Sequence, residues 1–374
     1  MKIRALLAVT VLVAGLSGPA TAEDNSFAQR AAATAQLLAG IAPAPGDPVV
    51  DRLAALECWK EQRQWMELQW SQVRNRLAAM ERWRAHEVRL GDGTDKTLIY
   101  PFSGPDFLNA YGMAPNHARY IFFSLEKPGT LPDLDAQNGA QFKQLLQDVR
   151  GAFRDIFERN YFITDYMTKQ LATPRITGSV PVLATMMALM DLRILKIEPV
   201  DLFPELTRAY EQAGAHRPRK LLRGVRIDFV DPRRGKPQQL YYFSLDASDK
   251  ALEYYPEFVD WVGRNHPATV FLKSASYLLH DNQFAKTREM LLASADIVIQ
   301  DDTGIPFRLL SRAPWQVRLY GKYAKPIKTL SYGYQKDLEA AYQARPETPV
   351  LPFPFGYSWR TQKSGLLVAT RERN

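Results

Sequence analysis

Residues 269–306, TVFLKSASYLLHDNQFAKTREMLLASADIVIQDDTGIP, decide the fold class of this chain. The apolar runs at 269–272 and 296–300 are typical of buried strands, and the segment between them is predicted to be helical. Strands that alternate with helices in this way predict an α/β fold. We expect mixed sheets with flanking helices, arranged as two weakly related lobes.

An earlier part of the chain has the same order of elements. The segment at 97–110, TLIYPFSGPDFLNA, and the segment at 118–132, ARYIFFSLEKPGTLP, again predict a strand, a short helix and a second strand. Polar residues again follow the strands, with Ser103 and Asp106 after the first and Glu126 after the second. Two explanations of this weak internal repeat stay open. One is a gene duplication, and the other is the alternation of strands and helices that unrelated α/β proteins share.

The polar residues at the ends of these four strands form the candidate site. The carboxyl ends of parallel strands lie at one edge of a sheet, and open α/β sheets bind ligands beyond that edge. We therefore expect the polar side chains to converge on one crevice between the lobes. The candidate ligand-binding residues are Ser103, Asp106, Glu126, Lys273, Ser274, Asp301 and Asp302.

Each candidate has a structural interpretation beside the functional one. Asp301 and Asp302 would ligate a divalent cation or supply a base of raised pKa, or Asp301 would cap a turn while Asp302 pairs with Arg308. Lys273 would activate Ser274 as a nucleophile, or would form an ion pair with one of these two aspartates. No other cofactor or metal is expected, and the catalytic residues, if there are any, stay unassigned.

Ser103 and Asp106 also have two interpretations. The Gly-Pro turn after Ser103 would fix that serine at a strand tip, and Asp106 would begin the following helix. The N-terminus of that helix would attract an anion, or the residues would form a plain N-cap turn.

Several common functional classes lack support in the sequence. It contains no G-x-S-x-G, P-loop, dinucleotide or H-E-x-x-H motif. The 48 Lys and Arg residues against 40 Asp and Glu give a net charge of +8, but the basic knots at 217–223 and 233–236 are typical of solvated loops. We therefore expect no nucleic-acid partner. Cys58 is the only cysteine, which excludes an intramolecular disulfide, and it is expected to be a core residue.

The first residues predict export. Lys2 and Arg4 precede an apolar run at 5–16, and Ala20-Thr21-Ala22 is typical of a signal-peptidase site. We expect residues 1–22 to be a signal peptide and the protein to be periplasmic or secreted. No later segment is long enough to span a membrane, so the processed chain is expected to be soluble.

The remainder of the chain divides into three predicted parts. Residues 23–47 are predicted to be a flexible lead-in. Residues 48–200 would hold a long amphipathic helix up to residue 90, and then the first α/β lobe. Trp59, Met66, Val73 and Met80 recur every seven residues along this helix, which would pack in the core or against a partner protein. Residues 201–374 would form the second α/β lobe, with a Pro-rich extended strap at 345–357 over its surface.

Five segments resemble a family of exported bacterial proteins to which no activity is assigned. They are YPFSGPDF (100–107), ITGSVPVL (176–183), YYFSLDAS (241–248), FLKSASYLLH (271–280) and QDDTGIPFR (300–308). Thr303 stands where the family pattern has serine, a change that keeps the hydroxyl. The resemblance implies an exported protein and adds no reaction.

The leading functional hypothesis is recognition of a small polar or glycan ligand in the crevice. Tyr254, Tyr357 and other aromatic residues would suit stacking on sugars, although such residues are usually part of a core. One alternative is a carboxylate- or metal-assisted hydrolase or transferase of the cell envelope. A second alternative is an envelope scaffold that binds a partner through the helix at 48–90. This scaffold would expose the apolar stripe through Trp59, Met66 and Val73.

Overall fold

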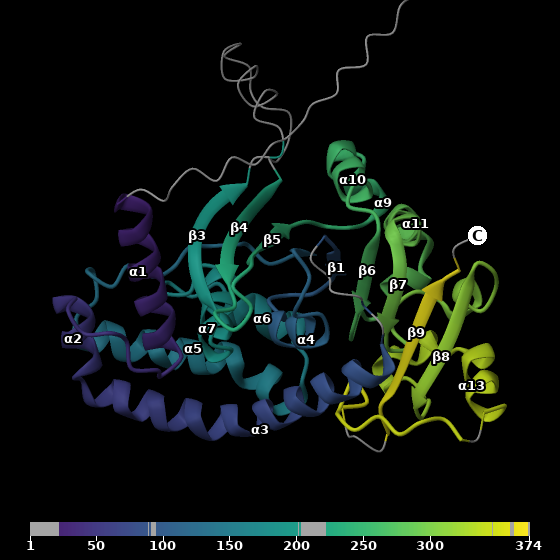
Figure 1. Ribbon diagram of the computed structural model, residues 1–374, viewed down its shortest axis with the longest axis horizontal. Coiled ribbons are helices and arrows are strands. Elements are labelled where there is room, and N and C mark those ends of the chain that lie inside the picture. Colours follow the sequence, from purple (N-terminus) through teal and green to yellow (C-terminus); the bar gives the residue numbers. More distant parts are fainter. Residues whose placement is uncertain are drawn as a thin grey trace, which may run out of the picture.

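The computed structural model describes residues 22–88, 90, 95–200, 202, 222–345, 347–359 and 363–372. Residues 1–21 of the predicted signal peptide and most of the basic knot at 217–223 lie outside the described residues. The described part is a mixed α/β structure, as predicted (Figure 1).

The strands of the described residues form one sheet of nine, in the order β3-β4-β5-β2-β1-β6-β7-β9-β8. The five central strands, from β5 to β7, are parallel, and antiparallel pairs close the sheet on both sides. The strands are β1 Thr97–Pro101, β2 Arg119–Ser124, β3 Arg193–Val200, β4 Arg223–Val230, β5 Pro237–Ser244, β6 Ala268–Leu272, β7 Ala295–Gln300, β8 Trp315–Gly321 and β9 Gly365–Arg371.

Helices cover both faces of this sheet. The first face carries α1 Ala22–Leu38, α2 Pro48–Ala54, α3 Glu57–Glu87, α4 Phe107–Met113, α5 Gly139–Arg159, α6 Thr164–Gln170 and α7 Val180–Leu189. The second face carries α9 Asp249–Leu252, α10 Pro256–Gly263, α11 Ala285–Ser294, α12 Phe307–Leu310 and α13 Lys336–Gln343. Short 3-10 helices are η1 Leu278–His280, η2 Asn282–Phe284 and η3 Lys328–Gly333.

The alternation of side chains along β1 separates the two cores. Leu98 and Tyr100 belong to the core under the first set of helices, whereas Ile99 belongs to the core under the second. Successive side chains of a strand point to opposite faces, so one central strand contributes to both cores. The strands on both sides of residue 200 share this sheet, because β1 and β2 lie between β5 and β6.

The prediction that residues 23–47 form a flexible lead-in is wrong for most of that segment, because the helix α1 occupies Ala22–Leu38. Ala31, Ala35 and Leu38 are buried, and α1 contacts β3 and α7. Alanine has the highest helix propensity and its small side chain lets a helix approach its neighbours closely. The small residues of this segment therefore allow α1 to pack closely on β3 and α7.

The predicted helix at 48–90 is present but interrupted. It divides into α2 and α3 near Ala55, and α3 runs along the lower side of the molecule in Figure 1. The heptad residues Trp59, Met66, Val73 and Met80 are all buried, and α3 packs on α4 and α5. The exposed apolar stripe that a scaffold would need is therefore not found on the described helix. Cys58 packs half-buried against the same core.

The Pro-rich strap is extended as predicted, but it does not only cross the surface. Leu351, Phe353 and Phe355 are buried in the first core. The strap leads into β9, which pairs between β7 and β8 and was not predicted.

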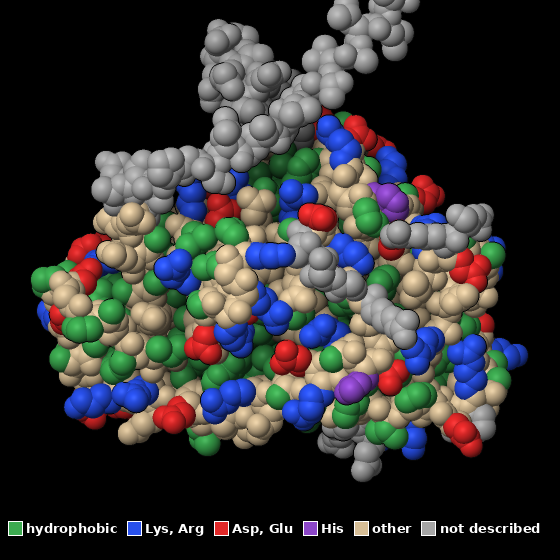
Figure 2. All heavy atoms as spheres, in the orientation of Figure 1, with side chains coloured by type: hydrophobic (Ala, Val, Ile, Leu, Met, Phe, Trp, Pro, Cys, Tyr) green, Lys and Arg blue, Asp and Glu red, His purple; other side chains and the backbone are tan. Residues whose placement is uncertain are grey.

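None of the described helices is both long enough and apolar enough to cross a membrane. Figure 2 shows cationic and anionic side chains interspersed over one face of the molecule.

Candidate functional site

The centre of the parallel sheet contains a topological switch point between β1 and β6. The chain leaves β1 through α4 on the first face and reaches β2 on one side. It leaves β6 through α11 on the second face and reaches β7 on the other side. The loops after β1 and β6 therefore diverge, and a hollow is left between them, which is where open α/β sheets bind ligands.

A pocket of about 480 Å³ occupies this hollow. We call it the switch-point pocket. Its polar wall includes Ser103, Asp106, Arg159, Lys273, Ser274 and Tyr357. Four of the seven predicted residues thus meet in one place, namely Ser103, Asp106, Lys273 and Ser274.

A buried ion pair joins the two loops. Lys273 Nζ lies 2.8 Å from Asp106 Oδ2, and the two side chains are 1% and 2% exposed. Lys273 also donates to the carbonyl oxygen of Asn160. Lys273 was predicted to pair with Asp301 or Asp302, and this was wrong. The strand before it, β6, lies between β1 and β7, and Lys273 pairs with the loop after β1, while Asp301 accepts from Ser274 and Thr303 instead.

Asp106 holds this position through its own hydrogen bonds. Its Oδ2 accepts from the Tyr100 hydroxyl at 3.1 Å, and its Oδ1 accepts from Asn109 N at 3.3 Å and Asn109 Nδ2 at 2.8 Å. Asp106 is also the N-cap of α4, as predicted. Each carboxylate oxygen therefore has two donors, which is what a buried carboxylate needs.

Burial and neighbouring charge act in opposite directions on Lys273. Burial lowers the pKa of Lys273, and the Asp106 carboxylate opposes that shift. A second cation, Arg76 of α3, lies close by, and its buried Nε and Nη2 have no hydrogen-bond partner among the described residues. Burial lowers the pKa of Arg76 to about 10, again opposed by Asp106. The Lys273 side chain is thus held by the Asp106 carboxylate, and it makes no hydrogen bond to Ser274 Oγ.

The backbone around the pocket is strained. Six non-glycine residues of the described chain have a left-handed backbone, and five of them lie here. They are Phe102, Asn160, Ser274, Ser276 and Tyr277. Each such residue costs roughly 1–3 kcal/mol and is found preferentially where function requires it.

Tyr357, from the Pro-rich strap, fixes the loop after β6. Its hydroxyl donates to the carbonyl oxygen of Ser274 at 2.9 Å and lies 2.6 Å from Ser276 Oγ. Two hydroxyls on the pocket wall have no such partner. Ser103 Oγ and Ser274 Oγ are buried without a hydrogen bond to any described residue. Buried polar atoms normally have a partner, so these two indicate a place for a bound molecule.

Asp301 shapes the turn after β7. Its Oδ1 accepts from Thr303 N at 2.9 Å and from the Thr303 hydroxyl, and its Oδ2 accepts from Ser274 N at 2.9 Å. The predicted turn-capping role is confirmed, and the carboxylate also ties the loop after β7 to the loop after β6. Gly356 packs directly on it, since a Cβ there would lie 2.1 Å from Asp301 Oδ2.

Asp302 lies in an adjoining hollow with Asp301, Lys322 and Lys363. The Tyr277 hydroxyl donates to Asp302 Oδ2, and the predicted pairing with Arg308 is not found among the described contacts. Burial and the Asp301 charge raise the pKa of Asp302 to about 7. The described residues contain no cluster of three or more His, Cys, Asp or Glu that could hold a metal ion.

Glu126 does not reach the switch-point pocket. It is buried beyond the end of β2, where Ser124 Oγ and Ser179 Oγ lie 2.7 and 2.8 Å from the Tyr242 hydroxyl. Burial raises the pKa of Glu126, and its Oε2 has no partner. Ser179 is the N-cap residue of α7, but its side chain makes no cap hydrogen bond.

Sequence reasoning missed three residues of the site, which are Arg159, Asn160 and Tyr161 at the end of α5. Tyr357 of the strap was named as an aromatic residue that would suit sugar stacking, but it was not placed in the crevice. Asn160 was recognisable as the left-handed residue that ends a helix, because asparagine tolerates that conformation. No local signal placed the strap beside β6.

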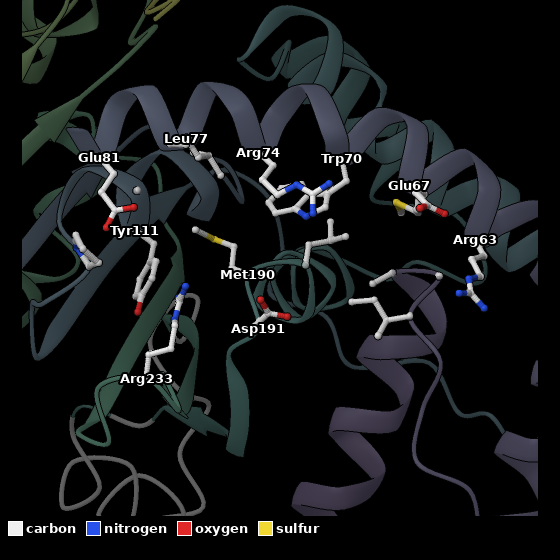
Figure 3. A pocket seen from close by; sticks show the side chains of 18 of the residues that line it. Arg63, Glu67, Trp70, Arg74, Leu77, Glu81, Tyr111, Met190, Asp191 and Arg233 are labelled. Carbon is white, nitrogen blue, oxygen red and sulfur yellow. The ribbon is translucent and has the colours of Figure 1, made fainter. Parts of the chain in front are cut away.

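A second hollow, of about 500 Å³, lies under α3 (Figure 3). Trp70, Leu77 and Met190 give it an apolar centre, and charged side chains surround them. Arg233 of its wall is already bound to the buried carboxylate of Asp231 at 2.8 Å. No side-chain N or O atom of the described residues in this wall is buried without a partner, in contrast to Ser103 Oγ and Ser274 Oγ.

Comparison with protein-family models, with curated proteins and with solved structures found no match. The resemblance carried by the five sequence segments therefore stays a prediction. The chemistry of the switch-point pocket is the basis on which a function can be assigned.

Proposed function

We propose that this chain recognises a small polar or glycan ligand in the switch-point pocket. The position of the pocket carries the proposal. It lies beyond the carboxyl ends of two parallel strands whose crossovers pass to opposite faces of the sheet, as ligand sites of open α/β proteins do. Its volume of about 480 Å³ lies within the range of roughly 300–1,000 Å³ that small-molecule sites occupy.

The side chains of the wall suit a hydroxylated ligand. Ser103 and Ser274 line the pocket, and the Oγ atom of each has no hydrogen-bond partner among the described residues. Tyr161 and Tyr357 meet edge to face with their ring centres 4.9 Å apart, and both line the pocket. An aromatic ring beside polar groups gives a sugar both an apolar platform and hydrogen-bonding partners.

The loops that form the pocket are held in place before any ligand binds. Asp301 accepts from the backbone of Ser274, and Tyr357 donates to the carbonyl of that same residue. A site that is ordered in advance loses less conformational entropy on binding, so a small ligand can be held with few contacts. We also propose that binding takes place outside the cytoplasm, as the predicted signal peptide implies.

The carboxylate- or metal-assisted hydrolase stays an alternative prediction. Asp302 would be its base, because its pKa of about 7 lies near neutral pH. Both oxygens of Asp301 already accept hydrogen bonds, which leaves that carboxylate less free to act. We favour the binding function because the hydroxyls of Ser103 and Ser274, which have no partner among the described residues, lie in the switch-point pocket and not beside Asp302.

A thermal-shift screen of the purified protein against sugars, sugar acids and other small polar compounds tests the proposal. A compound at a hundred times its Kd adds about 2.7 kcal/mol, which is roughly a 4 °C rise in Tm for a chain of this size. The rise should shrink in Ser103→Ala and Ser274→Ala and persist in Ser311→Ala, an exposed serine elsewhere. A rise that is unchanged in both pocket variants would place the ligand outside the pocket.

A further inference from the structure

The unused hydrogen-bonding groups of the switch-point pocket are mostly donors. On this basis we infer that the ligand carries a carboxylate, so that its chemical class is that of hydroxylated organic acids such as sugar acids. The inference rests on the proposed function and adds the charge of the ligand to it.

Most acceptors around the pocket are already occupied, and Asn160 Oδ1 is an acceptor without a partner among the described residues. Both oxygens of Asp106 have two donors each, from Lys273, Tyr100 and Asn109. The carbonyl oxygen of Asn160 accepts from Lys273, and that of Ser274 accepts from Tyr357. A ligand that only donates hydrogen bonds would therefore find few partners.

The donors, in contrast, have capacity left. A lysine ammonium has three N–H groups, and among the described residues Lys273 uses two of them, on Asp106 and Asn160. The guanidinium of Arg159 approaches a described carboxylate only through Nε, which is 3.8 Å from Asp155 Oδ1. That distance is too long for a hydrogen bond.

The charged groups around Lys273 differ in sign. The Asp106 and Asp301 carboxylates raise the pKa of Lys273, whereas the Arg76 guanidinium lowers it. Arg159 lies on the wall with its side chain 41% exposed, and Asp155 beside it is only 6% exposed. A ligand carboxylate therefore meets a cation that is reachable from solvent and whose ion pair with Asp155, at 3.8 Å, includes no hydrogen bond. Its planar guanidinium suits two parallel hydrogen bonds to a carboxylate.

The hydroxyls complete the recognition. Ser103 Oγ and Ser274 Oγ can each donate or accept, so they suit the hydroxyl groups of the same ligand. Arg159 would thus hold the acid group, while the two serines and the free N–H of Lys273 hold the hydroxylated body.

Matched pairs of sugars test this inference by isothermal titration calorimetry at constant ionic strength. Glucuronate and galacturonate are compared with glucose and galactose, which differ from them at one carbon. We expect the acids to bind and the neutral sugars to bind roughly 10- to 100-fold more weakly, the usual value of a charged hydrogen bond. Arg159→Gln should reduce the affinity for the acids by the same factor.

The control variant is Arg154→Gln, an exposed arginine of the same helix outside the pocket, which should leave both affinities unchanged. Neutral sugars that bind as tightly as the acids would overturn the inference and leave the proposed function standing. Acids that bind equally well to Arg159→Gln would overturn the role of that arginine and with it the inference. If no member of the panel binds, the glycan form of the proposed function fails together with the inference.

Discussion

Replacing Asp106 by asparagine should destabilise the protein strongly at pH 7. The substitution keeps the size of the side chain but leaves the Lys273 ammonium, which is 1% exposed, without its carboxylate. Removing one partner of a buried ion pair costs about 3–5 kcal/mol, because the remaining charge is uncompensated. Lys273→Met should cost less, since Asp106 keeps its donors Tyr100 and Asn109.

The double variant and the pH dependence test this reasoning further. Asp106→Asn combined with Lys273→Met should be more stable than Asp106→Asn alone, because no unpaired charge is left. In Asp106→Asn, burial lowers the pKa of Lys273 further, because Asp301 is then the only one of the two carboxylates that still opposes the shift. The unfolded chain then binds more protons than the folded chain between the lowered pKa and the ordinary lysine value near 10.4. The stability deficit should therefore shrink as the pH rises through that window.

Urea unfolding at pH 7 and pH 9.5, followed by fluorescence, measures these differences. Asp260→Asn, an exposed aspartate of α10, is the control and should change little. Equal losses for Asp106→Asn and Lys273→Met, with strict additivity in the double variant, would refute the picture of a coupled buried pair. So would a deficit that does not depend on pH.

Three further predictions concern the loops around the site. The pKa of Asp302 is raised to about 7, so the folded chain binds the extra proton between the ordinary aspartate value near 3.9 and pH 7, and stability falls as the pH rises through that window. Asp302→Asn should flatten this dependence in urea unfolding between pH 5 and pH 8, and an unchanged profile would contradict the assignment. Gly356→Ala should destabilise the protein by much more than Gly235→Ala, because both glycines have positive φ but only at Gly356 would a Cβ clash, 2.1 Å from Asp301 Oδ2. Equal shifts of the urea midpoint would argue against that close contact. Tyr357→Phe should cost about 1 kcal/mol for its lost hydrogen bonds and weaken binding of any ligand found in the screen, whereas unchanged affinity would show that the hydroxyl does not shape the pocket.

The fold class and half of the site followed from local patterns in the sequence. The apolar runs before Ser103 and Lys273 are strands, and their polar tips lie together because β1 and β6 are parallel neighbours. Adjacent carboxylates after β7 also predicted a turn, and Asp301 caps it. These features depend on residues close in sequence, whose patterns report backbone periodicity directly.

The contacts that complete the site depend on topology instead. Lys273 binds Asp106 and Asn160, which are more than a hundred residues away in the sequence. These contacts form because the fold brings β6 beside β1 and brings the end of α5 to the loops that follow both strands. Tyr357 reaches the pocket because the strap is buried through Phe353 and Phe355. An α/β sequence predicts that strands pair but not which strands are neighbours, so these partners could not be identified in advance.

The alanine-rich segment within 23–47 was wrongly predicted to be flexible for a different reason. Ala31 and Ala35 are small, and small residues are common in flexible segments as well as in tightly packed helices. Composition does not separate the two cases. The buried contacts of α1 with β3 and α7 decide in favour of the helix.

Soaking crystals of the protein with a library of small polar fragments would show where such ligands bind. We expect fragments to collect in the switch-point pocket, with hydrogen bonds to Ser103, Ser274 and Lys273, and acidic fragments to place their carboxylate against Arg159. Fragments that collect in the hollow under α3 while the switch-point pocket stays without any would contradict the proposed function.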